Sequence, residues 1–239
     1  MRIKRSFPTS LSAAAVLCAV LAAAQPVSAA PAHRVEIAYD LSRNGTPIAE
    51  LVEKLEHDGK AYRLSAHMKG KGIFALRGDA TRTSRGSIAA EGLRPVEFED
   101  RRSGRDPVRA TFDWPARTMT FYSKDGGPEV RPLPPDLQDR LSFGYAFSFR
   151  VPGAAPVGVS VTDGRGISTS SYRAAGREKV VTPAGEFEAL KLEREKKAPE
   201  DRTSEIWLSA RHGYVPVRVL VVEKDGTRVD QVATRITVQ

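Results

Sequence analysis

The sequence contains a single cysteine among 239 residues, Cys18, which lies close to the N-terminus. Leu17 precedes it, whereas a lipoprotein signal carries a small residue there, so we do not expect Cys18 to be lipidated. Beyond this position the chain has no thiol for a disulfide, a thiolate metal site or a cysteine nucleophile. A domain without disulfides has to be stabilised by its own packed core.

Histidine is scarce as well, with four residues: His33, His57, His67 and His212. A zinc site requires several ligands that converge. The expected pairing of strands around 49–57 and 61–68 places His57 and His67 on opposite faces of a sheet. We therefore expect neither a metal site nor a cofactor.

Recognisable catalytic motifs are also missing. No G-x-S-x-G sequence occurs, and the carboxylates alternate with Lys and Arg, as they do on solvated strand faces. A catalytic triad is recognised by its geometry and not by residue order, so a hydrolase stays open as an alternative. The sequence identifies no catalytic residue, and we favour a protein that is not an enzyme.

Long apolar runs are confined to the N-terminal end. Residues 11–24 form such a run, and residues 27–29 fit the small-residue pattern before a signal-peptidase site. The run is shorter than the ~20 residues that a membrane-spanning helix needs. We expect residues 1–29 to be a cleaved signal peptide and residues 30–239 to form a single periplasmic domain without a transmembrane segment. Basic residues precede the apolar run: Arg2, Lys4 and Arg5.

Basic residues outnumber acidic ones by 37 to 29, which gives a formal charge of +8 at pH 7. A mild positive balance suits anionic surfaces of the cell envelope, such as lipid headgroups. Nucleic acid is not an expected partner, because an exported protein rarely meets it. Two basic pairs, Arg101-Arg102 and Lys196-Lys197, fall near expected loops, where they are more typical of solubility than of an anion-binding patch.

Short runs in which apolar and polar residues alternate dominate the rest of the chain. Examples are HRVEIAYDLS, KAYRLSAHM, SEIWLSA and VPVRVLVVE, and Asn-Gly or Asp-Gly pairs at 44–45, 58–59 and 225–226 lie between such runs. Strand-sized runs with these corners are typical of antiparallel hairpins. The expected fold is all-β: a single curved antiparallel sheet that forms a half-barrel or flattened barrel with one or two short helices. A β-sandwich is the alternative.

The hairpin at Asp58 predicts where Glu53 lies. A two-residue turn at Asp58-Gly59 pairs Leu55 with Tyr62 and gives one apolar face, on which Glu53 is the exception. Glu53 then lies at the mouth of the barrel, is turned outward by a bulge, or serves as a polar anchor in a cavity. The first two positions are favoured, because an unpaired buried carboxylate costs free energy.

Two further hairpins have predicted registers. A two-residue turn at 225–226 pairs Val219 with Val232. The sequence TPAG at 182–185 predicts a three-residue loop, since Pro suits the second position of a turn and Gly the fourth. A change in the apolar phase predicts a bulge at 187–190 in the strand that follows.

The segment RPLPPDLQDRLSFGYAFSFRVPG, at 131–153, does not follow the alternating pattern. The paired prolines and Asp136 favour a helix that begins there and continues through at least Phe143, with a strand as the alternative for 141–149. Aromatic residues in such a segment are most often core, and they can also form the wall of an apolar cavity. The candidate cavity-lining residues are therefore Glu53, Phe143, Tyr145, Phe147 and Phe149.

Six stretches between about Val35 and Val222 form a recognisable set: GIFALRGDATRTSRGSI, GLRPVEFED, TFDW, DLQDRLS, TPAGEFEALKL and WLSARHGYVPVRV. Together they resemble a family of bacterial exported proteins, domain of unknown function 3108. The resemblance implies an exported, mostly β domain and supplies no activity or catalytic residue. Members often have an acidic residue in the turn where this chain has Arg211-His212, so that turn carries no implied role. By fold analogy alone, a curved sheet with a helix on its concave face is similar to periplasmic carriers of lipoproteins.

The leading hypothesis is a non-enzymatic periplasmic protein that binds an apolar or amphipathic envelope ligand, such as a lipid or acyl chain. The first alternative is an envelope assembly or interaction protein that uses an exposed sheet edge, such as the Ser-rich strand at 166–172. The second, less favoured, is a hydrolase of cell-wall or lipid material. An open or a filled concave face distinguishes the ligand-binding protein from the assembly protein.

Overall fold

The computed structural model describes residues 32–123, 127–196, 198–199 and 201–239. The predicted signal peptide at 1–29, Cys18 and Lys197 lie outside these ranges. No helix within them has both the length and the apolar character that crossing a membrane requires.

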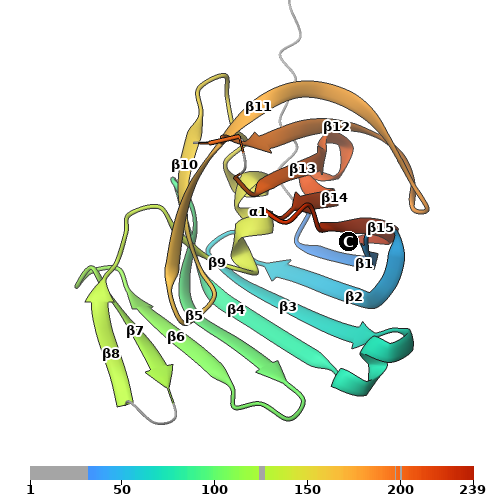
Figure 1. Cartoon of the computed structure of the whole chain (residues 1–239). Helices are drawn as coiled ribbons and strands as arrows, with labels where there is room; N and C mark the ends of the chain where they lie inside the picture. The colour runs from blue at the N-terminus through green and yellow to red at the C-terminus, as the bar shows by residue number, and fades with distance from the viewer. Residues whose placement is uncertain (1–31, 124–126, 197, 200) are drawn as a thin grey trace, which may run out of the picture.

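Fifteen strands of the described residues lie in one curved sheet (Figure 1). In chain order they are β1 Arg34–Arg43, β2 Thr46–His57, β3 Ala61–Gly70, β4 Ala80–Ala89, β5 Gly92–Arg102, β6 Val108–Asp113, β7 Thr118–Ser123, β8 Gly127–Pro132, β9 Leu137–Asp139, β10 Val157–Thr162, β11 Ile167–Thr182, β12 Gly185–Arg194, β13 Thr203–Ser209, β14 Val215–Val222 and β15 Arg228–Val238. The helical elements are the α-helix α1 Ser142–Phe149 and the 3₁₀ helices η1 Gly72–Arg77 and η2 Ala210–His212.

The strands form two meanders that meet at β1 and β15. The order across the sheet is β8-β7-β6-β5-β4-β3-β2-β1-β15-β14-β13-β12-β11-β10-β9. The first and last strands pair, with Ile37 opposite Ile236. Neighbouring strands in the described sheet run antiparallel, with the exception of β9 and β10. The predicted all-β fold with a single curved sheet and a short helix is confirmed, and the sandwich alternative is wrong.

The concave face is formed by alternate residues along each strand. The register aligns one row of five residues across β2 to β6, all of them fully buried: Leu55, Leu64, Ser84, Phe98 and Ala110. The helix α1 lies on this side of the sheet (Figure 1). The main core therefore occupies the space between α1 and the inner faces of the strands.

The second meander folds back over the first at β5. Gln138 in β9 donates from Nε2 to the carbonyl oxygen of Leu93 in β5, at 2.8 Å. The β10–β11 turn reaches the same region, where Gly164 lies against Phe98 and Val108. These contacts bring the two meanders together around α1, although β8 and β9 remain the unpaired ends of the sheet (Figure 1).

The β2–β3 hairpin differs from its predicted register by two residues. Leu55 faces Leu64 and not Tyr62. The Oδ1 atom of Asp58 accepts hydrogen bonds from two backbone N–H groups, at 2.7 and 2.8 Å, which makes Asp58 the first residue of the turn and not a central one. A shift of two residues preserves the alternation of faces, so Glu53 stays on the inner face.

The β14–β15 hairpin differs from its prediction by one residue, and the predicted pairing is wrong. Val219 faces Gln231 and not Val232. The loop is one residue longer than expected, because Asp225 Oδ1 accepts from the backbone N–H of Thr227 at 2.9 Å. A shift of one residue exchanges the two faces of the strand.

The TPAG turn is shorter than predicted. Thr182 pairs directly with Gly185, which leaves a two-residue turn. The register shift lies in β11, between Ala174 and Gly176, whereas pairing through 187–190 in β12 is continuous. Both predictions for this hairpin are wrong, because the phase of one strand does not show which partner carries the extra residue.

The helix begins later than predicted. Leu137–Asp139 form the short strand β9, so Asp136 does not cap a helix. Asp139 supports the first turn instead, since its Oδ1 accepts from the backbone N–H groups of Leu141 and Ser142, at 2.9 and 2.8 Å. From Ser142 to Phe149 the segment is helical, and the strand alternative is wrong there.

The Ser-rich segment at 166–172 is not an edge strand, as had been expected. It belongs to β11, which stands between β10 and β12 in the sheet and pairs with β10 from Ile167 to Tyr172. The outer strands are β8 and β9. All six residues of β8 are exposed, whereas the three residues of β9 are buried.

The contact of the β10–β11 turn with β5 and β6 predicts the effect of Gly164→Ala. Gly164 has φ +86°, and a Cβ there would lie 2.6 Å from Val108 Cγ1 and 3.4 Å from the ring of Phe98. We expect Gly164→Ala to lower the free energy of unfolding by about 1–3 kcal/mol, through overpacking and backbone strain. Chemical denaturation measures it.

The matched control is Gly166→Ala, in the same turn, where an added Cβ meets no atom within 4 Å. We expect this variant to stay within about 1 kcal/mol of the wild type. Equal losses of stability in the two variants would contradict the proposed closing contact.

Candidate functional site

The structure brings two of the predicted site residues together under α1. Tyr145 donates its hydroxyl proton to Oε2 of Glu53 in β2, at 3.0 Å. Glu53 lies half-buried on the inner face of the sheet. The carboxylate therefore points inward and is hydrogen-bonded, as in the polar-anchor alternative.

The surroundings of Glu53 change its titration. Burial raises the pKa of Glu53 to about 7, and the Tyr145 hydrogen bond and the charge of Arg82 oppose that rise. Burial also raises the pKa of Tyr145, with a further contribution from the charge of Glu53. Tyr39 packs in the same cluster and donates its hydroxyl proton to the carbonyl oxygen of Pro216 at 2.8 Å. Glu53 is thus the group in this cluster that changes charge near neutral pH.

The remaining aromatic residues of α1 pack against the sheet. Phe147 is buried, and its ring lies 5.5 Å from that of Phe143, which contacts the Tyr172 ring at 5.3 Å. Phe149 is half-buried, and its ring lies 5.2 Å from that of His57. These side chains fill the space between α1 and the strands, so the helix acts as a plug on the concave face.

One hollow borders this plug, and another lies on the outer face of the sheet. A hollow of about 370 Å³ at the end of the β2–β3 hairpin is lined by residues that include His33, His57 and Tyr62. Through His57 it borders Phe149, at the C-terminal end of α1. A second hollow, of about 300 Å³, lies over β5, β6 and β7.

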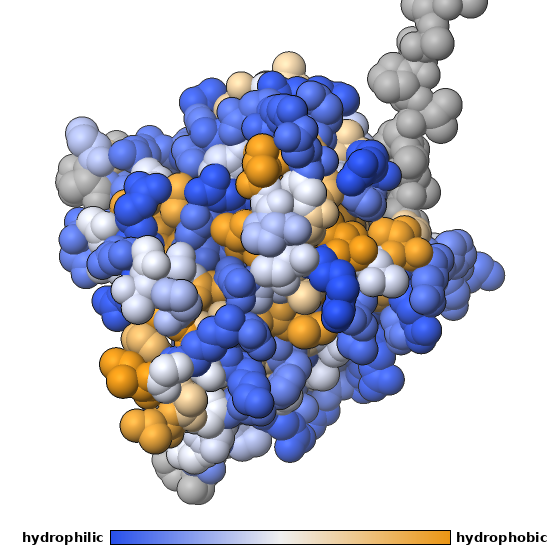
Figure 2. All heavy atoms as spheres, turned by 90° about the vertical axis from the view of Figure 1, so that its right-hand side faces the viewer, coloured by the Kyte–Doolittle hydropathy of each residue, from blue (hydrophilic) through white to orange (hydrophobic). Residues whose placement is uncertain are grey.

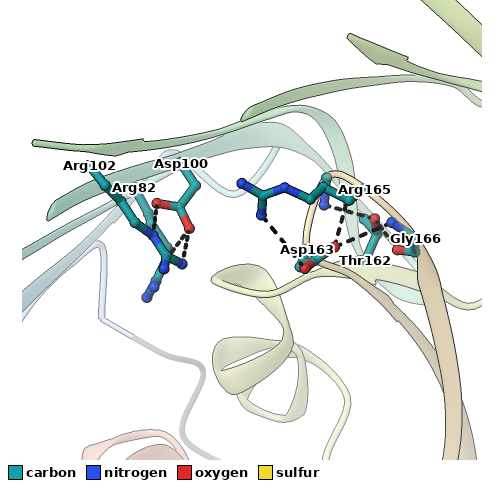
Figure 3. Close-up of polar contacts among 8 residues, drawn as sticks. Arg82, Asp100, Arg102, Thr162, Asp163, Arg165 and Gly166 are labelled. Carbon is teal, nitrogen blue, oxygen red and sulfur yellow. Dashed lines mark hydrogen bonds and ion pairs between the residues drawn. The ribbon is translucent and has the colours of Figure 1, made fainter. Parts of the chain in front are cut away.

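A group of arginine residues surrounds one buried carboxylate next to α1. The register places Glu53, Ala66, Arg82 and Asp100 in a row across β2 to β5. Asp100 is only 3% exposed and accepts from Arg82 Nε at 3.1 Å and from Arg102, whose terminal nitrogen lies at 2.8 Å. Figure 3 shows this group opposite the β10–β11 turn.

Arg140 joins this group from the junction of β9 and α1. Its backbone N–H donates to the carbonyl oxygen of Thr162 at 2.9 Å, which fixes the main chain beside β10. Burial lowers the pKa of Arg140, and the positive charges of Arg82, Arg102 and Arg202 lower it further. Several cations therefore converge where the two meanders meet.

A second polar chain holds β9 against β4. Tyr62 OH and Ser84 Oγ lie 3.0 Å apart, and Ser84 donates to Asp139 Oδ2 at 2.5 Å. Burial raises the pKa of Asp139 to about 6, and the hydrogen bonds from Ser84 and from the first turn of α1 act in the opposite direction. This chain is structural, since it connects one strand to the start of the helix.

The histidines are spread over the structure. His67 in β3 bonds Asp79 at 3.0 Å, far along the hairpin from His57, which stacks on His33 at 5.0 Å. Within the described ranges, His, Asp and Glu do not gather into a group that could hold a metal ion.

One serine–histidine pair bears on the hydrolase alternative. Ser209 Oγ lies 2.8 Å from His212 Nδ1. Ser209 is only 1% exposed, and the ring of His212 packs on Phe187, 5.6 Å away. Burial and the neighbouring Arg211 lower the pKa of His212. A nucleophile must reach its substrate, so this buried pair fits a structural role better than catalysis.

Sequence reasoning missed Arg82, Asp100 and Arg140. The alternation of faces carried a signal for the first two. Arg82 lies two residues from the inward Ser84 in β4, and Asp100 lies two residues from the inward Phe98 in β5, so each points to the inner face. The Arg101-Arg102 pair was assigned to solubility, yet only Arg101 faces outward, where it pairs with Glu99. Arg140 carried no signal, because its neighbours come from distant parts of the sequence.

The raised pKa of Glu53 predicts how Glu53→Gln changes stability with pH. In the folded protein Glu53 keeps its proton up to about pH 7, whereas in the unfolded chain it ionises near its model value of 4.5. Wild-type stability therefore falls as pH rises between these values. Glutamine keeps an acceptor for Tyr145 and cannot ionise. Relative to wild type, Glu53→Gln should gain unfolding free energy between about pH 5 and about pH 8, by at most about 3 kcal/mol.

Denaturation curves of both proteins at the two pH values provide the measurement. Glu50→Gln is the control, because Glu50 lies exposed on the outer face of the same strand. Its difference from wild type should be the same at both pH values. A pH-independent difference for Glu53→Gln would show that the carboxylate is not held in a desolvated position.

Comparison with solved structures finds similar folds at low identity. A β-barrel-like protein of the domain of unknown function DUF1849 from Brucella abortus superposes with a TM-score of 0.57 at 8% identity, over 87% of this chain and 99% of that one. An exported protein of YmcC-like fold from Bacteroides fragilis gives a TM-score of 0.38 at 12% identity, over 85% and 95% of the two chains. A lipoprotein from Parabacteroides distasonis gives 0.41 at 11%, over 85% and 94%. The first of these supports the curved barrel-like fold.

A search among curated proteins found no match. The sequence profile of a family described as a protein of unknown function, DUF3108, matches residues 37–232. This match covers most of the chain and includes the strands that carry Glu53, Arg82 and Asp100, and the β9–α1 junction that carries Arg140. The chain therefore belongs to the DUF3108 family.

Proposed function

We propose that this protein is a periplasmic, non-enzymatic module that binds an amphipathic envelope ligand, such as a lipid or acyl chain, on its concave face. The export signal expected at residues 1–29 supports the compartment. The observation that carries the proposal is the helix α1: an aromatic plug rests on the concave face of an unclosed sheet, directly beside a group of charged residues.

The plug is attached by few polar contacts. Besides Tyr145–Glu53, α1 is held by Ser148 Oγ, which donates to the carbonyl oxygen of Tyr214 at 2.9 Å, and by Asp139 at its first turn. An eight-residue helix has little stability of its own, so these contacts and the aromatic packing determine its position. A modest displacement of α1 would expose an apolar surface, which an acyl chain could then cover.

The chemistry of the surface agrees with an amphipathic ligand. Half-buried aromatic residues, Phe143 and Phe149, lie at the two ends of the helix, and cationic side chains lie beside its start. The side of the molecule that carries β15 and η1 shows apolar residues between polar ones (Figure 2). Ligand sites commonly combine apolar walls with a few fixed polar groups.

The assembly alternative has less support. The Ser-rich strand is paired within the sheet, and of the two end strands, β8 and β9, the exposed one is β8. This edge carries Pro128 and Pro132 with Glu129 and Arg131 between them. Prolines and charges are typical of edges that are protected against pairing with another chain. The filled space under α1 is the one observation that favours the assembly alternative. It also agrees with ligand binding if α1 moves aside when the ligand enters.

Native mass spectrometry of protein purified from its own periplasm tests the proposal, together with titration of a fluorescent fatty acid. We expect a co-purified lipid and saturable binding of the probe. Phe149→Ser should weaken probe binding about tenfold, or roughly 1.4 kcal/mol, because it removes an aromatic contact from the plug. Circular dichroism verifies that the variant is folded.

Leu76→Ser is the matched control, because Leu76 is 91% exposed on η1. It removes an apolar side chain away from the plug and should leave binding unchanged. Protein that carries no lipid and binds no probe would refute the proposed function. If Phe149→Ser and Leu76→Ser weaken probe binding equally, the probe adheres to the protein surface without specificity, and the proposed site at α1 is refuted.

A further inference from the structure

The guanidinium of Arg140 has no partner in the described part of the chain. Its backbone is bonded to Thr162, but none of the described residues accepts a hydrogen bond from its side chain or forms an ion pair with it. The side chain remains accessible to solvent. Because the guanidinium is exposed, its donors are free to reach an external acceptor, and it lies close enough to other cations for their charges to lower its pKa.

The neighbouring charges increase this imbalance. Arg82, Arg102 and Arg202 lie close enough to oppose the charge of Arg140, while Asp100 is the acidic neighbour that favours it. Asp100 is already occupied by Arg82 and Arg102, which bind both of its oxygens. Arg82 and Arg102 therefore share Asp100, and Arg202 is paired elsewhere, with Glu223 at 3.2 Å.

The other acidic groups near this junction are also occupied, since Asp139 accepts from Ser84 and from the first turn of α1, and Asp163 is bonded within its own turn. Asp163 lies in the β10–β11 turn, near Arg102 (Figure 3). Its Oδ1 accepts from the backbone N–H groups of Arg165 and Gly166 at 3.0 and 3.3 Å, and its Oδ2 lies 3.9 Å from the Arg165 guanidinium. Asp163 thus shapes the turn, and within the described ranges neither Asp139 nor Asp163 forms an ion pair with Arg140.

Arg82 also has donors to spare. Its side chain is 16% exposed, and Nε makes its recorded contact with Asp100. Its terminal nitrogens donate to none of the described residues. The Ser84–Asp139 hydrogen bond brings the β9–α1 junction, which carries Arg140, against β4, which carries Arg82. Guanidinium groups are suited to binding oxyanions.

We propose that Arg140 and Arg82, supported by the Asp100–Arg102 pair, bind the anionic head of the ligand, a phosphate or carboxylate group. This inference rests on the proposed function and specifies the polar end of the ligand. The charged head lies at the junction of the two meanders, and the apolar part extends along α1. Arg102 is a positioning residue, because it orients Asp100 and, through it, Arg82.

Paired probes test the inference: a dansylated fatty acid and its uncharged methyl ester, which share chain and fluorophore. We expect the wild type to bind the acid about tenfold more tightly than the ester, with the difference lost at high salt. Arg140→Gln should weaken the acid about tenfold and leave the ester unchanged. Arg140→Lys should recover part of the loss, since it restores the charge without the planar fork.

Arg85→Gln is the matched control. Arg85 lies in the same strand as Arg82 but on the outer face, exposed and paired with Glu97. It removes one positive charge without touching the site and should change neither probe. Arg140→Gln should unfold at the same or a higher denaturant concentration than wild type, because it removes an unpaired cation from among like charges.

Inorganic phosphate as a competitor distinguishes the source of the anion. If phosphate does not displace the fatty acid, the site binds an anionic head only as part of an amphipathic molecule. If phosphate displaces the fatty acid from the wild type and not from Arg140→Gln, the site also binds free phosphate. Either result supports the inference. Equal affinities for acid and ester in wild type and Arg140→Gln would overturn it and leave the proposed function standing. If neither probe binds, the proposed function fails, and NMR of the arginine Nε–H signals with phosphate decides the inference: a shift at Arg140 supports it, and no shift overturns it.

Discussion

The buried carboxylate of Asp139 is the contact on which the arrangement of this fold depends. The sheet has two unpaired end strands, so hydrogen bonds between strands do not close it. Asp139 accepts from Ser84 in β4 and from the first turn of α1, and the adjacent Arg140 bonds to β10. One side chain thus connects the two meanders and the helix. Its hydrogen bonds offset the desolvation that raises its pKa to about 6.

The candidate site follows from this closure. Because Asp139 holds the first turn of α1 in place, Tyr145 comes to lie over Glu53, and Arg140 comes to lie near Arg82. The inner face around it combines a mostly apolar row, which begins at Leu55 and includes Ser84, with a row that begins at Glu53, two residues away along β2, and carries Arg82 and Asp100. A purely structural core gains nothing from unpaired cations, whereas a ligand site requires groups that are not already satisfied.

The alternation of residues predicted the fold class and placed Glu53 on the apolar face, because an error of two residues at the β2–β3 turn leaves the faces unchanged. The bulge that was one of the two favoured explanations for Glu53 is wrong, since β2 pairs with β3 without interruption there. Turn lengths were less predictable, since Asp58 and Asp225 each bond to the backbone, and these bonds move the turn relative to its Gly. The helix start was missed for a related reason. Asp139 is held by Ser84, a tertiary contact that local sequence does not contain, and the meeting of Arg140 with Arg82 depends on the same contact.

A helix as short as α1 is held by its surroundings, and those surroundings include charges on both sides. Glu53 lies under Tyr145, and Arg140 lies two residues before the first helical residue. An anion bound at Arg140 would neutralise repulsion at the start of the helix, while ionisation of Glu53 would add charge beneath its centre. Both events act on the contacts that keep the plug in place. The position of α1 is therefore coupled electrostatically to the occupant of the concave face, which a plug packed only by apolar contacts would not be.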